Sequence, residues 1–143
     1  MSVDIAVIDY GAGNLRSIRR ALEAAGATVT VTANAETVLA ADAVVFPGVG
    51  AAGAAMQRLR DLDLISPIHD VVAQERPFLG ICLGMQLLFE EQEEGSTRGL
   101  GLLQGRVRSL SSEVKVPQIG WNRTLWVQDG AGSRAGESGD FYF

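Results

Sequence analysis

Apolar and polar positions along this chain follow two periods, one typical of strands and the other of helices. Val3–Tyr10 is an apolar, β-branched run that ends in the glycine turn Gly11–Asn14, which predicts a strand followed by a turn. Apolar side chains then recur at three- and four-residue spacing over residues 15–25, and Gly26 follows them. This spacing predicts an amphipathic helix that a glycine closes.

The same alternation of apolar runs and helical patterns continues along the next part of the chain. We expect further strands at Ala27–Thr32, Ala43–Phe46 and Phe78–Cys82, and helices at Ala51–Leu62, at Ile68–Glu75 and from Leu83 to about Glu91. Strands that alternate with helices indicate βαβ units and a parallel sheet with helices on both faces. The predicted fold is therefore an α/β three-layer sandwich around a largely parallel sheet.

The pattern changes in the last part of the chain. The run Glu90–Gly99 is charged and predicts a loop, while the stretches 106–110 and 123–128 predict later strands. Phe141–Phe143 has the character of a strand that begins without a partner, and unpaired strands are a liability for a folded protein. We therefore expect one domain over residues 1–143 that lacks its C-terminal part.

Composition excludes several classes of function. Apolar residues make up 47% of the chain and charged residues 20%, which is typical of a globular protein. With 17 acidic against 12 basic residues, the chain has no basic footprint for nucleic acid. It has no run of about 18 apolar residues that would span a membrane. A single cysteine allows no internal disulfide, so the cytoplasm is the expected compartment.

Candidate chemistry centres on the only cysteine, Cys82, which lies between two glycines in the sequence GICLG. The form GxCxG at a strand-to-helix junction is typical of a nucleophile elbow, a sharp turn that projects the middle side chain. A thiol at this position would lie at a helix N-terminus, whose partial positive charge favours the thiolate. The backbone N–H of Leu83 would face an oxyanion formed by attack. Gln86 follows four residues after the cysteine, on the same helix face, where its amide could hold a polar substrate.

Two other glycine turns should lie beside this elbow. GAGN and PGVG both follow apolar strands, and the carboxyl ends of parallel strands meet at one edge of a sheet, where ligands bind. The turn at Val49 or Gly50 could therefore supply a second oxyanion donor. Such chemistry needs no metal or organic cofactor, because thiolate attack and an oxyanion hole suffice to cleave an amide.

Each of these residues also has a plainer interpretation. A lone cysteine is often an inert buried residue, PGVG can be an ordinary turn, and Gln86 can be a solvated helix residue. GAGN could be interpreted as a phosphate loop, but the third glycine of GxGxxG would fall at Arg16. The only histidine, His69, lies in a predicted helix beside Asp70 and is expected to be solvated, so the residues alone supply no base.

Five short motifs carry a resemblance to a known family. DYGAGNL, FPGVG, GICLGMQ, KVPQIGWN and GDFYF together resemble the class I (triad) glutamine amidotransferases, and within them the glutaminase subunits of imidazole glycerol phosphate synthase. The resemblance implies a flavodoxin-like core and hydrolysis of glutamine to glutamate and ammonia. It implies that Cys82 is the nucleophile, that Val49, Gly50 and Leu83 form the oxyanion hole, and that Gly48 and Gln86 bind glutamine.

The resemblance also implies a protein partner and no metal or organic cofactor. The partner is a cyclase subunit with a (β/α)8 barrel, which forms a heterodimer with the glutaminase and receives its ammonia. The surface that meets the cyclase is implied at Asn14, Pro117, Gly120, Trp121 and Asn122. Gln118 and Ile119 differ from the His and Met that the family usually has there.

A larger difference from the family concerns the catalytic base. In the family a histidine directly follows a segment like FYF, and a glutamate two residues later completes the Cys-His-Glu triad; neither is present here. We therefore expect this chain alone to be inactive. Two alternatives remain open: a non-catalytic module that binds a partner, and another cysteine hydrolase in which an acidic residue activates the thiol.

Overall fold

A computed structural model describes residues 2–130 and 132–143 of the chain. The chain forms two compact units, of which the first ends at Ser109 and the second comprises Leu110–Phe143. In the part of the chain that the structure describes, no helix has both the length and the apolar character needed to cross a membrane.

The first unit is built around a parallel sheet of four strands in the order β2-β1-β3-β4. The strands are β1 (Asp4–Ile8), β2 (Thr28–Thr32), β3 (Ala43–Gly48) and β4 (Phe78–Cys82). The central strand β3 is apolar and buried beyond its first residue, and β1 is buried from Ala6 to Ile8, as expected of parallel strands that are covered on both faces. All four predicted strands are present, and the bounds of β4 are those predicted.

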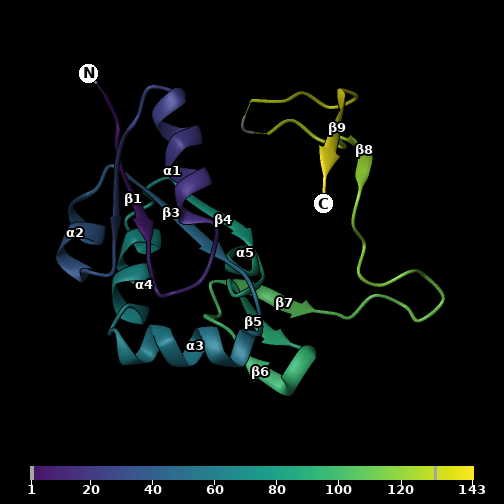
Figure 1. Cartoon of the computed structure of the whole chain (residues 1–143), viewed down its shortest axis with the longest axis horizontal. Helices are drawn as coiled ribbons and strands as arrows, with labels where there is room; N and C mark the ends of the chain where they lie inside the picture. Colours follow the sequence, from purple (N-terminus) through teal and green to yellow (C-terminus); the bar gives the residue numbers. More distant parts are fainter. Residues whose placement is uncertain (1, 131) are drawn as a thin grey trace. The chain divides into compact units, whose positions relative to one another are not determined.

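Helices cover both faces of this sheet (Figure 1). They are α1 (Leu15–Ala24), α2 (Ala35–Ala40), α3 (Ala52–Asp61), α4 (Ile65–Ala73) and α5 (Leu83–Gln86). The apolar stripe of α1 packs against Val7, Val29 and Val45 on one face of the sheet. The larger core on the other face contains Phe46 with buried side chains of α2, α3, α4 and α5. The predicted three-layer α/β sandwich is confirmed.

Three helices differ from the prediction, and α2 and α4 are the first two. α2 was not predicted, although Asn34 provides its start signal: the Asn34 Oδ1 accepts a hydrogen bond from the Thr37 N–H at 2.9 Å, the usual N-cap arrangement. α4 begins at Ile65 and so includes Pro67 in its first turn. Proline is tolerated there because the first N–H groups of a helix have no intrahelical acceptor, so the prediction that this helix starts after Pro67 is wrong.

The predicted helix from Leu83 to about Glu91 is wrong beyond Gln86. Past that residue the chain forms β5 (Phe89–Gln92), the 3-10 turn η1 (Glu94–Ser96), β6 (Thr97–Arg98) and β7 (Leu103–Val107). These strands make a second sheet in the order β6-β5-β7. The strands β5 and β6 lie largely where a charged loop was predicted, and β7 begins before the strand predicted at 106–110 and overlaps it. The Leu87 carbonyl accepts the Leu100 N–H at 2.7 Å, so pairing with distant residues replaces the continuation of the helix.

The second unit contains an antiparallel pair of strands, β8 (Trp121–Leu125) and β9 (Ser138–Tyr142). Trp121 lies opposite Tyr142 with ring centroids 5.7 Å apart, edge to face, and such pairs stabilise a strand pair. The expectation that the aromatic end of the chain lacks a strand partner is wrong, because β9 includes Phe141 and pairs with β8.

Candidate active site

Three glycine turns lie at the carboxyl edge of the parallel sheet, as predicted. They follow β1, β3 and β4, which are neighbours in the sheet. The first two turns are in close contact, since a Cβ added at Gly13 would lie 3.2 Å from the Pro47 side chain. The third turn lies beside the second because Gly48 and Cys82 are paired residues of β3 and β4.

Cys82 has the backbone conformation of an elbow. It is the last residue of β4 and the N-cap of α5, with φ of 54° and ψ of −119°, a region that non-glycine residues rarely occupy. Strained residues of this kind concentrate at functional sites. The thiol is exposed, so the alternative that Cys82 is a buried core residue is wrong.

The glycines on either side of Cys82 are required by close packing. A Cβ at Gly80 would lie 2.7 Å from the Met85 Cα, and one at Gly84 would collide with the Phe46 carbonyl. Real Cβ atoms do not approach other atoms so closely, so any larger residue would push α5 away from the sheet. The two glycines therefore allow α5 to turn back tightly over β3 and β4 and leave the cysteine at the tip.

The candidate oxyanion donors lie on both sides of this tip. Leu83 is the first residue of α5 and 4% exposed, and an N–H in the first turn of a helix has no intrahelical acceptor. Val49 and Gly50 follow β3 and are both exposed, and Gly50 has a φ of 93°. Both residues thus lie exposed just beyond Gly48, the residue of β3 that pairs with Cys82.

Two cavities open near these residues. Leu83 and Gln86 line a cavity of about 90 Å³, together with Ala52, Gln92, Glu94, Val107, Arg108 and Ser109. Val49 and Gly50 line a different cavity of about 250 Å³, beside Tyr10. Leu83 and Gln86 therefore share one hollow, Val49 and Gly50 line the other, and Cys82 is among the lining residues of neither.

The smaller cavity contains residues that the sequence prediction missed. Glu94 and Arg108 have opposite charges and come from η1 and from the residue after β7. Glu94 falls in the run Glu90–Gly99, which was predicted to be a loop, and Arg108 falls in the predicted strand at 106–110, whose pairing partner was not predicted. One local signal was available for the first of these segments: the uncharged Gln92 interrupts the acidic sequence EEQEE, which is unusual for a charged loop.

Tyr10 is a second residue that the prediction missed. Its ring packs 5.5 Å from that of Phe46, it is 1% exposed, and its hydroxyl has no hydrogen-bond partner. A Cβ at Gly48 would collide with this hydroxyl, so the phenol lies directly against the start of the PGVG turn. Burial, and then the nearby Cys82, raise the pKa of Tyr10 to about 12.

We expect Tyr10→Phe to stabilise the protein by about 1 kcal/mol, because it removes a buried hydroxyl that lacks a partner. Urea unfolding at pH 7 measures the effect. Tyr142→Phe is the matched control, since Tyr142 is 63% exposed and its change should be close to zero. A loss of stability in the Tyr10 variant would mean that the hydroxyl has a partner in solution.

The raised pKa adds a pH dependence to this comparison. The ordinary tyrosine pKa is 10.0 and the folded value is about 12, so between these values the unfolded chain loses the proton first. Stability of the parent chain should therefore fall as pH rises from 10 towards 12. The Tyr10→Phe variant should lack this part of the slope.

His69 remains separate from the candidate site. It is half-buried within α4. It lines neither the cavity that contains Gln86 nor the cavity that contains Val49. Among residues 2–130 and 132–143, no three or more His, Cys, Asp or Glu side chains gather so that they could hold a metal ion.

The residues implied at a partner surface divide between the two units. Asn14 caps α1, where its Oδ1 accepts a hydrogen bond from the Ser17 N–H at 3.3 Å. Pro117, Gly120, Trp121 and Asn122 belong to the second unit. In that unit the Asn122 Nδ2 donates to the Gly120 carbonyl at 3.1 Å. The indole of Trp121 is 73% exposed, an open aromatic surface on this unit.

Gln118, where the family usually has His, makes a local contact in the second unit. The Gln118 Nε2 donates to the Asn122 Oδ1 at 3.2 Å, so it helps to hold the amide beside Trp121. Ile119 is 65% exposed and adds to the apolar surface there.

Comparisons with known proteins agree with the architecture and the motifs. The structure of a protein from Listeria monocytogenes named as a peptidase E superposes with a TM-score of 0.59 at 15% identity, over 71% of this chain and 63% of that chain. This likeness supports the fold, an α/β arrangement with a parallel central sheet, and it says nothing about activity.

Relatives found by sequence have a much higher identity to this chain than the peptidase E structure has. A protein of Synechococcus elongatus named imidazole glycerol phosphate synthase subunit HisH is 55% identical over 121 residues, covering 83% of this chain and 56% of the relative. The subunit of that name from Aquifex aeolicus is 50% identical over 140 residues, covering 96% of this chain and 67% of the relative. The chain thus spans little more than half the length of the first of these relatives.

The family comparison covers the elbow and most of the second unit. The family described as glutamine amidotransferase class-I matches residues 6–135, which include the three glycine turns, Cys82 and Trp121. The identity to HisH subunits extends over most of the same residues. This chain belongs to the class-I glutamine amidotransferase family.

Proposed function

We propose that this chain provides the glutamine-hydrolysing part of an imidazole glycerol phosphate synthase in histidine biosynthesis, acting in the cytoplasm. The observation that carries the proposal is the exposed Cys82, held with positive φ at the β4–α5 junction beside the PGVG turn. The names of the similar HisH subunits support the same assignment.

The proposed reaction is amide hydrolysis through a thioester. The Cys82 sulfur attacks the side-chain carbonyl carbon of glutamine, which forms a C–S bond and puts negative charge on the carbonyl oxygen. The Leu83 N–H stabilises that charge, and the peptide groups of Val49 and Gly50, although they line the other hollow, are the proposed second source of donors. Collapse breaks the C–N bond, and the leaving nitrogen takes up a proton and departs as ammonia. Water then attacks the thioester, releasing glutamate and restoring the thiol.

The charges of the smaller cavity suit the amino-acid end of glutamine. A free amino acid carries an ammonium, which the Glu94 carboxylate can bind, and a carboxylate, which the Arg108 guanidinium can bind. The Gln86 amide, which lines this cavity, and the backbone at Gly48 are the groups proposed to bind the remaining polar groups of the substrate. These assignments predict selectivity by charge and by chain length.

The proposed base for this chemistry is not His69. That residue is the only histidine of the 143-residue sequence, and it lies apart from both cavities. Activation of the thiol and protonation of the leaving nitrogen therefore depend on a histidine and a glutamate placed as in the triad family.

The proposed partner is a cyclase subunit with a (β/α)8 barrel, which receives the ammonia and forms imidazole glycerol phosphate and an aminoimidazole carboxamide ribotide. Asn14 on the first unit and the segment around Pro117, Gly120, Trp121 and Asn122 on the second are the proposed contacts. An exposed indole is the kind of side chain that dominates protein interfaces.

We expect Trp121→Ala to weaken cyclase binding by roughly 2 kcal/mol or more, because a 73% exposed indole is free to be buried by a partner. Calorimetric titration with the cyclase measures the loss. Val127→Ala is the matched control, since Val127 is 85% exposed on the same unit. If Trp121→Ala lowers the stability of the free chain as much as its affinity, Trp121 serves folding instead.

Substrate recognition is tested by protection of the thiol. Glutamine should slow the alkylation of Cys82 by iodoacetamide in a saturable manner, while asparagine, one methylene shorter, should protect much less. Glu94→Gln and Arg108→Met should each weaken protection by about tenfold, the effect of one lost charged contact. Equal protection by both amino acids, or none by either, would exclude glutamine as the ligand of this cavity.

A further inference from the structure

The end of the elbow helix is held by contacts that reach across the first unit. The carbonyls on either side of Gln86 both accept backbone N–H groups, Met85 from Leu88 at 3.2 Å and Leu87 from Leu100 at 2.7 Å. The Leu88 donor is local, three residues after Met85, whereas the Leu100 donor comes from a distant segment. Carbonyls in the last turn of a helix need such donors, because the helix itself no longer supplies them.

The carbonyl of Gln86 is satisfied by a side chain instead. The Gln92 Nε2 donates to it at 2.7 Å, and Gln92 is only 4% exposed. The backbone of Gln92 lies on β5, the middle strand of its sheet, paired with Thr97 on one side and Val107 on the other. The donor therefore projects from a strand that is fixed on both edges.

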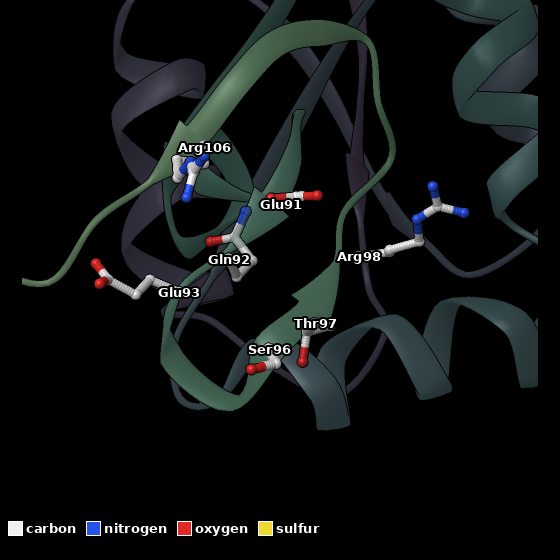
Figure 2. Close-up of a pocket in the computed structure, with 7 residues that line it drawn as sticks. All are labelled: Glu91, Gln92, Glu93, Ser96, Thr97, Arg98 and Arg106. Carbon is white, nitrogen blue, oxygen red and sulfur yellow. The ribbon is translucent and has the colours of Figure 1, made fainter.

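Gln92 also lines two cavities. One is the cavity of about 90 Å³ shared with Leu83 and Gln86, and the other is a hollow of about 300 Å³ on the second sheet. Figure 2 shows the larger hollow, with Gln92 at its centre below Arg106 and Glu93 extending away from it. The buried amide is thus part of the wall of the candidate substrate cavity.

We propose that Gln92 is a positioning residue that holds Gln86 in place for glutamine binding. The proposal rests on the proposed function, since it concerns the same cavity. Loss of the amide donor leaves the Gln86 carbonyl buried without a partner, which the chain relieves by tilting that peptide. Tilting the peptide turns the Gln86 side chain out of its position, so glutamine affinity falls although Gln92 need not touch the substrate.

The test compares two reagents on the 143-residue protein. A glutamine-derived chloromethyl ketone binds before it alkylates Cys82, while iodoacetamide reports the thiol alone. In Gln92→Met, which keeps the side-chain length and removes the donor, the half-saturating concentration of the chloromethyl ketone should rise about tenfold. The iodoacetamide rate should stay within about twofold of the parent. Gln104→Met is the control, an exposed glutamine on the neighbouring strand β7.

A second variant and a second readout keep the outcomes distinct. Gln92→Asn retains an amide that is too short to reach the carbonyl and should behave like Gln92→Met. Hydrogen exchange at Leu87, whose N–H bonds to the Leu83 carbonyl, should be faster in both variants. Unchanged saturation in either folded variant, or an equal loss with both reagents, overturns the positioning role. Absence of saturation in the parent chain contradicts the proposed function, while the exchange result still decides whether Gln92 holds α5.

Discussion

Cys82→Ser should abolish covalent capture by a glutamine-derived chloromethyl ketone. A serine hydroxyl has nearly the shape of the thiol but is a far weaker nucleophile without a strong base, and the elbow backbone can accept either residue. Intact-mass spectrometry should show a single adduct on the parent chain and none on the variant. Urea unfolding should give almost the same stability for both, because the side chain at this position is exposed.

Met85→Leu is the control for this substitution. Met85 lies on α5 three residues after Cys82 and is 48% exposed, so its replacement leaves the thiol and the elbow in place. Adduct formation should persist in that variant. If Cys82→Ser still forms the adduct, the reactive group lies elsewhere in the chain and the elbow assignment is wrong.

Glutamine hydrolysis should be essentially absent from the 143-residue chain, even with the cyclase and its ligand present. Loss of the base from a cooperative catalytic set can cost on the order of a million-fold in rate. A chimera that continues this chain with the remainder of the Aquifex aeolicus HisH sequence, including the histidine and glutamate that the family resemblance implies, should recover cyclase-dependent hydrolysis. Release of glutamate measures the activity of the 143-residue chain and of the chimera.

The same chimera with Cys82→Ser is the control and should be inactive. The opposite outcome is also informative: turnover by the 143-residue chain at the rate of the chimera would mean that a residue within it acts as the base. His69→Gln would then separate the histidine from an acidic residue. Either result would show that the family triad does not apply to this sequence.

Local signals in the sequence were sufficient to predict the core of the fold and the position of the elbow. An apolar run followed by glycines predicted the end of β4 at Cys82, because the strand period and the need for small residues at a tight turn both act over a few residues. The meeting of the three glycine turns followed from the rule that parallel strands share a carboxyl edge. Only the packing at Gly80 and Gly84, which the structure supplies, shows why larger residues are excluded.

Contacts between distant residues account for what the sequence could not predict. Leu83–Glu91 has a helical pattern, yet the chain leaves the helix after Gln86 because Leu100 and Leu103 bond to the carbonyls beyond it. Gln92 therefore fell in a predicted loop, although it is a buried donor in a sheet. The sequence places Tyr10 at the end of a strand. That its hydroxyl is buried against Gly48 without a hydrogen-bond partner depends on tertiary packing and could not be predicted.

The kinetics of Cys82 alkylation by the glutamine-derived chloromethyl ketone test the central claim most directly. In the folded chain the rate should saturate with reagent concentration and exceed that of the same chain in urea by at least about a hundredfold at low concentration, because the bound reagent lies next to the thiol. Added glutamine should compete. A rate that rises linearly with reagent concentration and equals that of the unfolded chain would contradict a glutamine-directed nucleophile at Cys82.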